Sequence, residues 1–285
     1  MINAQVEFLR SDNQRLIFGD GVFNILDMAG IGTLTPEIFT KKKAVDHGSI
    51  VTGYRIPERE FSIKAEVGDA SLNRQYLSIL NSFFNPVYTY DVTVTYLGDS
   101  KLAKNCYIRK FDDGAGKNIY RPIVPVITMM YPDAFFLSTD EFGKDIASVN
   151  AGFIWPYRHL IGESFCFGVY AFGGRVQVFN DGDVTAYIKV AFAFTGECTA
   201  PAVYKDESYV RILGDFHSGD RLIIDAYDKS VKLNGQNIST RVEKGSKWND
   251  MILQLGDNVV SYDAEHGSNN VNVYVYYNKR YLGIN

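Results

Sequence analysis

The sequence predicts an all-β protein of two domains, with one helix in the first. Aromatic residues make up 14% of the chain, and such side chains suit the pleated, half-buried surface of strands. Apolar and polar residues alternate along several segments. The stretch Gly219–Ile238 has the pattern of a β-meander: two strand-like runs are joined at Asp228-Lys229 and closed by Asn234-Gly235, a pair that favours type I′ turns. Together these observations favour antiparallel sheets over a helical or α/β fold.

The first domain is predicted to span residues 1–137. Residues 60–67 alternate between polar and apolar side chains, and residues 88–96 do the same, which predicts two antiparallel strands with one wet face each. Between them a helix is predicted over about 71–84, with Ser71 as its N-cap and Pro86 beyond its end. Residues 101–111 and 123–130 supply further strands, and the domain should close near Tyr131-Pro132-Asp133.

The second domain is predicted to span residues 138–285, after a polar, irregular linker that begins at residue 138. Turn signals then recur at intervals typical of a β-sandwich. Asn278-Lys279 is predicted to start a last hairpin into residues 280–282. The other predicted strands lie at 165–170, 184–194, 209–213, within 219–238, and at 251–255, 259–262 and 271–277.

Composition excludes several classes of partner. The 29 basic and 33 acidic residues give a net charge of −4. The chain therefore lacks the overall positive charge that favours specific DNA binding or binding to an anionic membrane. The N-terminus lacks a secretion signal and no apolar run reaches the roughly 18 residues of a membrane helix, so we expect folding in a cytoplasm. Cys106, Cys166 and Cys198 match no zinc or disulfide pattern and are expected to be buried.

No catalytic, cofactor-binding or metal-binding residues are predicted. The histidines stand apart from other metal ligands, and surface or loop positions are expected for His47, His159, His217 and His266. No serine-nucleophile elbow occurs. Gly116-Lys117 resembles a phosphate loop but lacks the required earlier glycine and the following Ser or Thr, so a turn is the better interpretation.

Three polar segments are candidates for other chemistry. The turn Asn180–Asp183 could supply oxygens to Ca²⁺, but it matches no full calcium loop and Asx-rich turns form for backbone reasons. Glu58 and Glu60 flank Arg59, and a solvated strand start is favoured over a glycosidase carboxylate pair. Lys41-Lys42-Lys43 is likewise predicted to be solvated surface, too short a basic run for nucleic acid.

Several segments in both parts of the chain share one family's pattern. In the N-terminal part they are ILDMAGIGT (25–33), EIFTKKKAVDHGSIVTGYRIPEREFSI (37–63) and MMYPDAFF (129–136). In the C-terminal part they are NDGDVTAYIKV (180–190), the meander, and LQLGDNVVSY (253–262). Through these segments both ends of the chain resemble the siphophage distal tail protein family of long-tailed, non-contractile bacteriophages. At residues 183–189 the chain departs from the family's pattern, where a proline often follows the Gly-Asp turn.

The resemblance implies an N-terminal split β-barrel and a C-terminal galectin-like or carbohydrate-module-like β-sandwich. It further implies a hexameric ring in the phage tail tip, possible back-to-back rings, and assembly in the host bacterial cytoplasm. The implied partners are the tail tube protein, the tail-associated hub protein and receptor-binding proteins, with DNA passing through the ring without specific binding. No enzyme activity, no cofactor and no membrane partner are expected.

Two other functions are left open by the sequence. The C-terminal sandwich could belong to a carbohydrate-binding adhesin that recognises host cell-wall polysaccharide, because a flat ring can stack on a sugar; Trp155, Trp248 and several tyrosines are the candidates. Cell-wall hydrolysis would need a carboxylate pair or a metal, for which the sequence offers no candidate.

Overall fold

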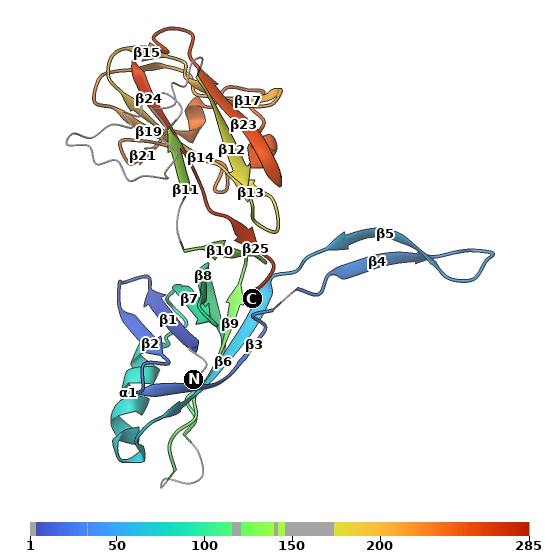
Figure 1. The fold of residues 1–285 in the computed structure, drawn as a ribbon, viewed down its shortest axis with the longest axis vertical. Helices are drawn as coiled ribbons and strands as arrows, with labels where there is room; N and C mark the ends of the chain where they lie inside the picture. Colours follow the sequence, from blue (N-terminus) through green and yellow to red (C-terminus); the bar gives the residue numbers. More distant parts are fainter. Residues whose placement is uncertain (1–3, 33, 116–120, 140–141, 146–173, 285) are drawn as a thin grey trace, which may run out of the picture. The chain divides into compact units, whose positions relative to one another are not determined.

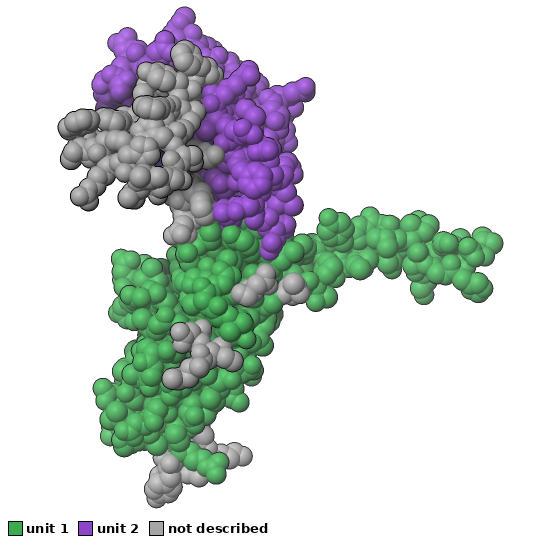
Figure 2. Space-filling view, in the orientation of Figure 1, with its two compact units in different colours: residues 1–139, 280–285 green, residues 140–279 purple. Residues whose placement is uncertain are grey.

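The computed structural model describes residues 4–32, 34–115, 121–139, 142–145 and 174–284. It divides into two compact units, residues 1–139 with 280–285 (unit 1) and residues 140–279 (unit 2), which Figure 2 colours green and purple. The sequence places the whole C-terminal part in one domain after residue 137, whereas in the structure the last residues lie in unit 1. The strand at Arg280–Tyr281 pairs with Phe136–Ser138, so the predicted final hairpin from Asn278-Lys279 is wrong.

The elements of unit 1 run in the order shown in Figure 1. They are β1 (Ala4–Arg10), β2 (Arg15–Phe18), β3 (Phe23–Ala29), β4 (Glu37–Lys42), β5 (Ser49–Arg55), β6 (Arg59–Val67), the 3₁₀-helix η1 (Ala70–Leu72), α1 (Asn73–Phe83), β7 (Tyr90–Tyr96), β8 (Asp99–Asp112), β9 (Val126–Tyr131), β10 (Phe136–Ser138) and β25 (Arg280–Tyr281).

The main sheet of unit 1 is antiparallel and has the order β2-β1-β7-β8-β9-β6-β3, with β10 joining β8 and β25. Its two end strands, β2 and β3, are joined by a short turn that brings the Phe18 and Phe23 rings to 4.9 Å between centroids. The sheet therefore curls into a half-barrel around an aromatic core that includes Phe8, Phe61 and Phe84.

The predicted alternation is confirmed on β6 and β7. Phe61, Ile63 and Ala65 are buried on β6, and Val92 and Val94 on β7, while the residues between them remain partly or fully exposed. The period of two places the apolar side chains on one face, where they form the core of the half-barrel.

The helix α1 covers one side of the core through Leu80 and Phe83, both buried. It is preceded by η1, whose first turn is capped by Asp69: the carboxylate accepts a hydrogen bond from the Ser71 amide at 2.8 Å. The predicted N-cap, Ser71, instead lies inside η1. The chain enters the helix through this extra turn, which moves the cap two residues earlier.

Unit 2 is a β-sandwich with short accessory strands. Its elements are β11 (Phe142–Asp145), β12 (Arg175–Asn180), β13 (Ala186–Tyr187), β14 (Lys189–Phe194), β15 (Cys198–Thr199), β16 (Ala202–Lys205), β17 (Ser208–Arg211), β18 (Asp215–Phe216), β19 (Arg221–Asp225), β20 (Ser230–Leu233), β21 (Gln236–Asn237), the 3₁₀-helices η2 (Ser239–Arg241) and η3 (Trp248–Asp250), β22 (Ile252–Leu253), β23 (Gly256–Asp263) and β24 (Val271–Tyr277).

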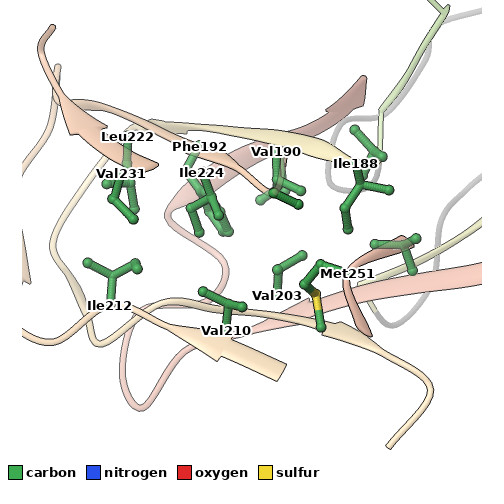
Figure 3. Close-up of a cluster of buried hydrophobic side chains, with 14 of the residues drawn as sticks. Ile188, Val190, Phe192, Val203, Val210, Ile212, Leu222, Ile224, Val231 and Met251 are labelled. Atoms are coloured by element: carbon green, nitrogen blue, oxygen red, sulfur yellow. The ribbon is translucent and has the colours of Figure 1, made fainter. Parts of the chain in front are cut away.

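Two sheets of unit 2 face each other, with the orders β11-β24-β14-β19-β20-β21 and β12-β23-β16-β17. Figure 3 shows the space between them filled by side chains from both sheets, with Val190 and Ile224 above and Val203 and Val210 below. This apolar layer confirms the predicted sandwich architecture of the C-terminal part.

The predicted meander is confirmed as β19, β20 and β21. Asn234 and Gly235 both have positive φ, 50° and 84°, as a type I′ turn requires. Asp220 holds this turn from the side, because its carboxylate accepts a hydrogen bond from the Asn234 amide group at 2.8 Å. Val231 is buried against the core, so the meander belongs to the scaffold of the sandwich.

Candidate functional site: an assembly surface

The strands β4 and β5 form a long hairpin, here called the arm, that projects from unit 1 (Figures 1 and 2). Among the described residues they pair only with each other, in a separate two-stranded sheet. The turn between them contains Gly48, which has a positive φ of 90°. An isolated two-stranded hairpin is marginally stable in water, so the arm needs a further contact to be held rigidly.

Both faces of the arm carry exposed apolar side chains. Ile38 lies opposite Tyr54, and Phe39 opposite Gly53; since consecutive strand residues point to opposite faces, Ile38 and Phe39 lie on different sides of the arm. Ile38 is 60% exposed, Tyr54 74% and Val51 63%. A strand pair with apolar side chains exposed on both faces is a candidate surface for burial against another chain.

The arm is also the basic part of an acidic chain. Residues 37–55 contain four Lys or Arg and two Asp or Glu, a net charge of +2, so the remainder of the chain carries −4 − 2 = −6. Lys41, Lys42 and Lys43 are exposed, as predicted, but they stand at the distal part of the arm. The opposite signs of arm and remainder favour contact between the arm of one copy and the surface of another.

The root of the arm is fixed by Arg59, whose side chain is buried with 1% exposure. Its Nε donates to the Ala134 carbonyl at 2.9 Å, and one terminal nitrogen donates to the carbonyls of Gly30 and Gly32 at 2.9 and 2.7 Å. The other terminal nitrogen donates to the Leu282 carbonyl. Gly30 and Gly32 precede the arm and Arg59 follows it, so one side chain ties together the entry and exit of the arm.

Arg59 has no ion-pair partner among the described residues, and burial lowers its pKa to about 10. Its guanidinium lies 4.4 Å from the centre of the Phe136 ring, which offers a further attraction to the cation. The expectation that Glu58-Arg59-Glu60 is a solvated strand start therefore fails for Arg59. Glu60 is exposed and forms an ion pair with Arg109 at 3.1 Å.

The side chains of the Asx-rich turn make contacts within the protein. Asn180 is buried, and its side-chain oxygen accepts a hydrogen bond from the Gly182 amide. The Asp181 carboxylate forms an ion pair with Lys279 at 2.7 Å, and hydrogen bonding to that lysine lowers the pKa of Asp181. Among the described residues, no three His, Cys, Asp or Glu side chains gather in a way that could hold a metal ion.

The remaining candidates are dispersed. His47 lies in the turn of the arm, and His217 and His266 are exposed in unit 2. Cys106 and Cys198 are buried free thiols, and burial raises the pKa of both, to about 11 for Cys198. His159, Cys166, Trp155 and Gly116-Lys117 lie outside the described residues. Trp248 packs against the core of the sandwich.

Neither the arm nor the buried position of Arg59 is predicted from the sequence. A signal for the arm was present: apolar residues are adjacent at Ile38-Phe39 and Ile50-Val51, without the alternation of a strand that has one wet face. For Arg59 no local signal exists, because its partners are distant in sequence.

No helix within the described residues has the length and apolar content to cross a membrane.

The described residues define an all-β protein in which a half-barrel with a projecting apolar arm is followed by a β-sandwich. Residues 181–281 match the family model described as "Siphovirus-type tail component, C-terminal domain". The predicted resemblance to siphophage distal tail proteins is thereby confirmed. No curated protein sequence matches the chain.

Solved structures show the same fold over nearly the whole chain. The Dit protein of phage SPP1, described as a paradigm of hub adsorption apparatus in phages that infect Gram-positive bacteria, matches with a TM-score of 0.67 and 14% identity, covering 96% of this chain and 98% of that one. Chains of the phage p2 baseplate in its activated conformation match with TM-scores of 0.57 (with Sr) and 0.52 (with Ca). Both are 10% identical and cover 97% of this chain and 98% of theirs.

Proposed function

We propose that this protein is a structural component of a long-tailed phage tail tip, where it forms a hexameric ring that serves as the hub of the baseplate. The single observation that supports the ring is the arm. Its two strands pair with each other, and its apolar side chains are exposed in the described chain. The tail-component domain at residues 181–281 and the fold shared with hub and baseplate proteins support its place in the tail.

Ring closure follows from the asymmetry of the contact. The arm is a projecting, basic and apolar surface, so it fits a different, more acidic surface on the next copy and not another arm. Such a head-to-tail contact generates a ring when the rotation closes. Burying the arm also provides the packing that a two-stranded hairpin lacks in water.

The proposed partners follow from a position of the ring between the tail tube and the tail tip. The ring would join the tail tube protein to the tail-associated hub protein and carry receptor-binding proteins at its periphery, after assembly in the host cytoplasm. The net negative charge of the chain suits a ring through which DNA passes without specific binding. We propose a structural role without enzyme activity.

Light scattering on the purified full chain tests the proposal. We expect a mass near six times 32.1 kDa, or twice that for back-to-back rings. The double variant Ile38→Asp/Val51→Asp places charge on the exposed arm, so it should lower the mass to that of a single folded chain.

Leu255→Asp is the matched control, because Leu255 is an exposed apolar residue of unit 2 with a similar exposure, 56%. We expect Leu255→Asp to keep the mass of the native assembly. A ring that persists in the arm variant, or a native chain that stays monomeric, would contradict the proposed role of the arm.

A further inference from the structure

A cluster of polar and aromatic side chains lies on the outer face of the sandwich sheet β12-β23-β16-β17. Val203 and Val210 point into the core of unit 2 (Figure 3), so their neighbours Tyr204, Tyr209 and Arg211 point to the opposite face of β16 and β17. Two carboxylates from other segments reach the same place, and the five side chains form what we call the Arg211 cluster: Tyr204, Tyr209, Arg211, Glu243 and Glu265.

The backbone holds the carboxylates in position. The Glu243 amide donates to the Arg211 carbonyl at 2.9 Å, and the Lys247 amide donates to the Tyr209 carbonyl at 2.9 Å, so residues 243–247 run along β17. The Glu265 amide donates to the Thr199 carbonyl at 3.0 Å. Backbone hydrogen bonds thus assemble the cluster from segments far apart in sequence.

The polar atoms of the cluster are close together but incompletely paired. Arg211 donates one hydrogen bond to the Tyr204 hydroxyl at 3.0 Å, and this bond raises the pKa of Arg211. Its other terminal nitrogen lies 3.9 Å from a Glu243 oxygen and 3.6 Å from a Glu265 oxygen, both too far for a direct hydrogen bond. The Glu243 carboxylate interacts with the Tyr209 hydroxyl, which raises the pKa of Tyr209. Arg211 Nε and the Oε2 atom of Glu243 are buried and have no hydrogen-bond partner in the described chain.

Aromatic surface lies beside these atoms. The rings of Tyr204 and Tyr209 are 5.8 Å apart between centroids, and the Arg211 guanidinium is 5.5 Å from the Tyr209 ring centre. On the neighbouring strand Ser261 is paired with Tyr204, and Val259, which is exposed, lies two residues away on the same face. Val259 therefore adds one exposed apolar side chain beside the cluster.

The unpaired atoms define the chemistry of a ligand. Arg211 offers donors only and Glu243 and Glu265 offer acceptors only. A phosphate or carboxylate could pair with Arg211 but would be repelled by the two glutamates, and a cation would be repelled by Arg211. A hydroxyl group both donates and accepts, so it can satisfy both kinds of atom at once.

We propose that the Arg211 cluster is a binding site for an uncharged saccharide, whose hydroxyl groups bridge Arg211 and Glu243 while a sugar ring stacks on Tyr204 or Tyr209. The apolar C–H face of a pyranose complements a tyrosine ring, and the adjacent hydroxyls meet the charged groups. The site lies wholly within unit 2 and does not depend on ring formation. It would let the proposed tail hub contact a surface polysaccharide directly.

The full-length protein is tested on immobilised oligosaccharides of three kinds: neutral hexoses and deoxyhexoses, N-acetylated amino sugars, and hexuronic acids. We expect saturable binding to at least one sugar of the first two kinds. Arg211→Met keeps the length of the side chain but removes its donors, and Glu243→Gln replaces one acceptor; each should raise the dissociation constant at least tenfold. Tyr209→Ala, which removes a stacking ring, should do the same.

Arg221→Met is the matched control, since Arg221 is exposed on β19 in the other sheet of the sandwich. It should change the dissociation constant less than twofold, and the melting temperatures of all variants are compared to exclude unfolding. The proposal is overturned by a lack of saturable binding to any uncharged sugar, by tightest binding to hexuronic acids, or by equal losses in Arg211→Met and Arg221→Met. If Arg211→Met does not fold, Glu243→Gln and Tyr209→Ala decide the outcome in the same way.

Discussion

Replacing Arg59 by Met should loosen the root of the arm and the C-terminal segment together. Methionine keeps the apolar stem of the side chain but removes every donor. The carbonyls of Gly30, Gly32, Ala134 and Leu282 then lose the guanidinium that they share. Because these carbonyls belong to three separate stretches of unit 1, the substitution should affect all three.

The structure allows the size of the effect to be worked out. The carbonyl of Ala134 is bonded in a buried setting, and leaving such a group unpaired costs about 1–3 kcal/mol. The other three bonds are partly buried, so water can replace part of each, and we assign about 0.5–1 kcal/mol to each of them. Burial already lowers the pKa of Arg59 to about 10, and the desolvation that this reflects offsets part of the gain. We expect a loss of about 3 kcal/mol in the free energy of unfolding of unit 1.

Hydrogen exchange measured by mass spectrometry locates the effect. The Ile284 amide donates to the Ile31 carbonyl at 3.0 Å, so peptides that cover residues 30–32 and 280–284 should lose protection together in Arg59→Met. Peptides from the meander at 219–238 serve as the internal control, because they belong to unit 2. Urea denaturation of the same samples gives the free energy of unfolding.

Arg15→Met is the matched control, since Arg15 is an exposed arginine paired with Glu7 at the surface. Exposed ion pairs contribute about 0–1 kcal/mol. A change below about 1 kcal/mol in Arg59→Met, with unaltered exchange at both peptides, would refute the reasoning that one buried cation fixes the arm and the C-terminal segment.

Two further predictions concern unit 2 and the thiols. In a Cys166→Ser background, the thiols of Cys106 and Cys198 should stay unreactive toward a disulfide reagent at pH 8 until denaturant unfolds the protein, because both are buried and their pKa values are raised; rapid labelling of the native protein would contradict this. Asp220 accepts hydrogen bonds from the His217 amide and the Asn234 side chain, which lower its pKa. Its folded pKa is below its unfolded value near 3.9, so its contribution is present above that value and is lost as the pH falls through the folded pKa. The difference in the free energy of unfolding between the native chain and Asp220→Asn should therefore be larger at pH 7 than at pH 2.5, and a difference independent of pH would count against it.

Local patterns in the sequence were sufficient for the elements whose partners are near in the chain. The alternation on β6 and β7 predicts which side chains are buried because a strand has a strict period of two. The Asn234-Gly235 pair predicts its turn because both residues tolerate positive φ. These features depend on residues that are neighbours or nearly so.

The features that sequence could not provide depend on distant contacts. Arg59 stands between Glu58 and Glu60 and looks solvated, yet it is buried because carbonyls remote in sequence converge on it. The strand Arg280–Tyr281 is too short to indicate that it pairs with β10 instead of forming a hairpin. The apolar residues of the arm would have the same sequence pattern in a buried strand. They are exposed because no other part of the described chain packs against them.

The Arg211 cluster illustrates the same limit. Glu243 and Glu265 are separated from Arg211 by long stretches of sequence, and only the sandwich brings them to one face. The sequence offered Trp155, Trp248 and several unspecified tyrosines as ring platforms for a sugar. Trp248 packs against the core, and Trp155 lies outside the described residues.

Electron microscopy of the purified full-length protein tests the central claim most directly. The account predicts closed rings of six copies with a central hole, in which the arm of each copy, residues 37–55, lies against the next copy. Single copies without rings, or rings in which the arm stays free in solvent, would contradict it.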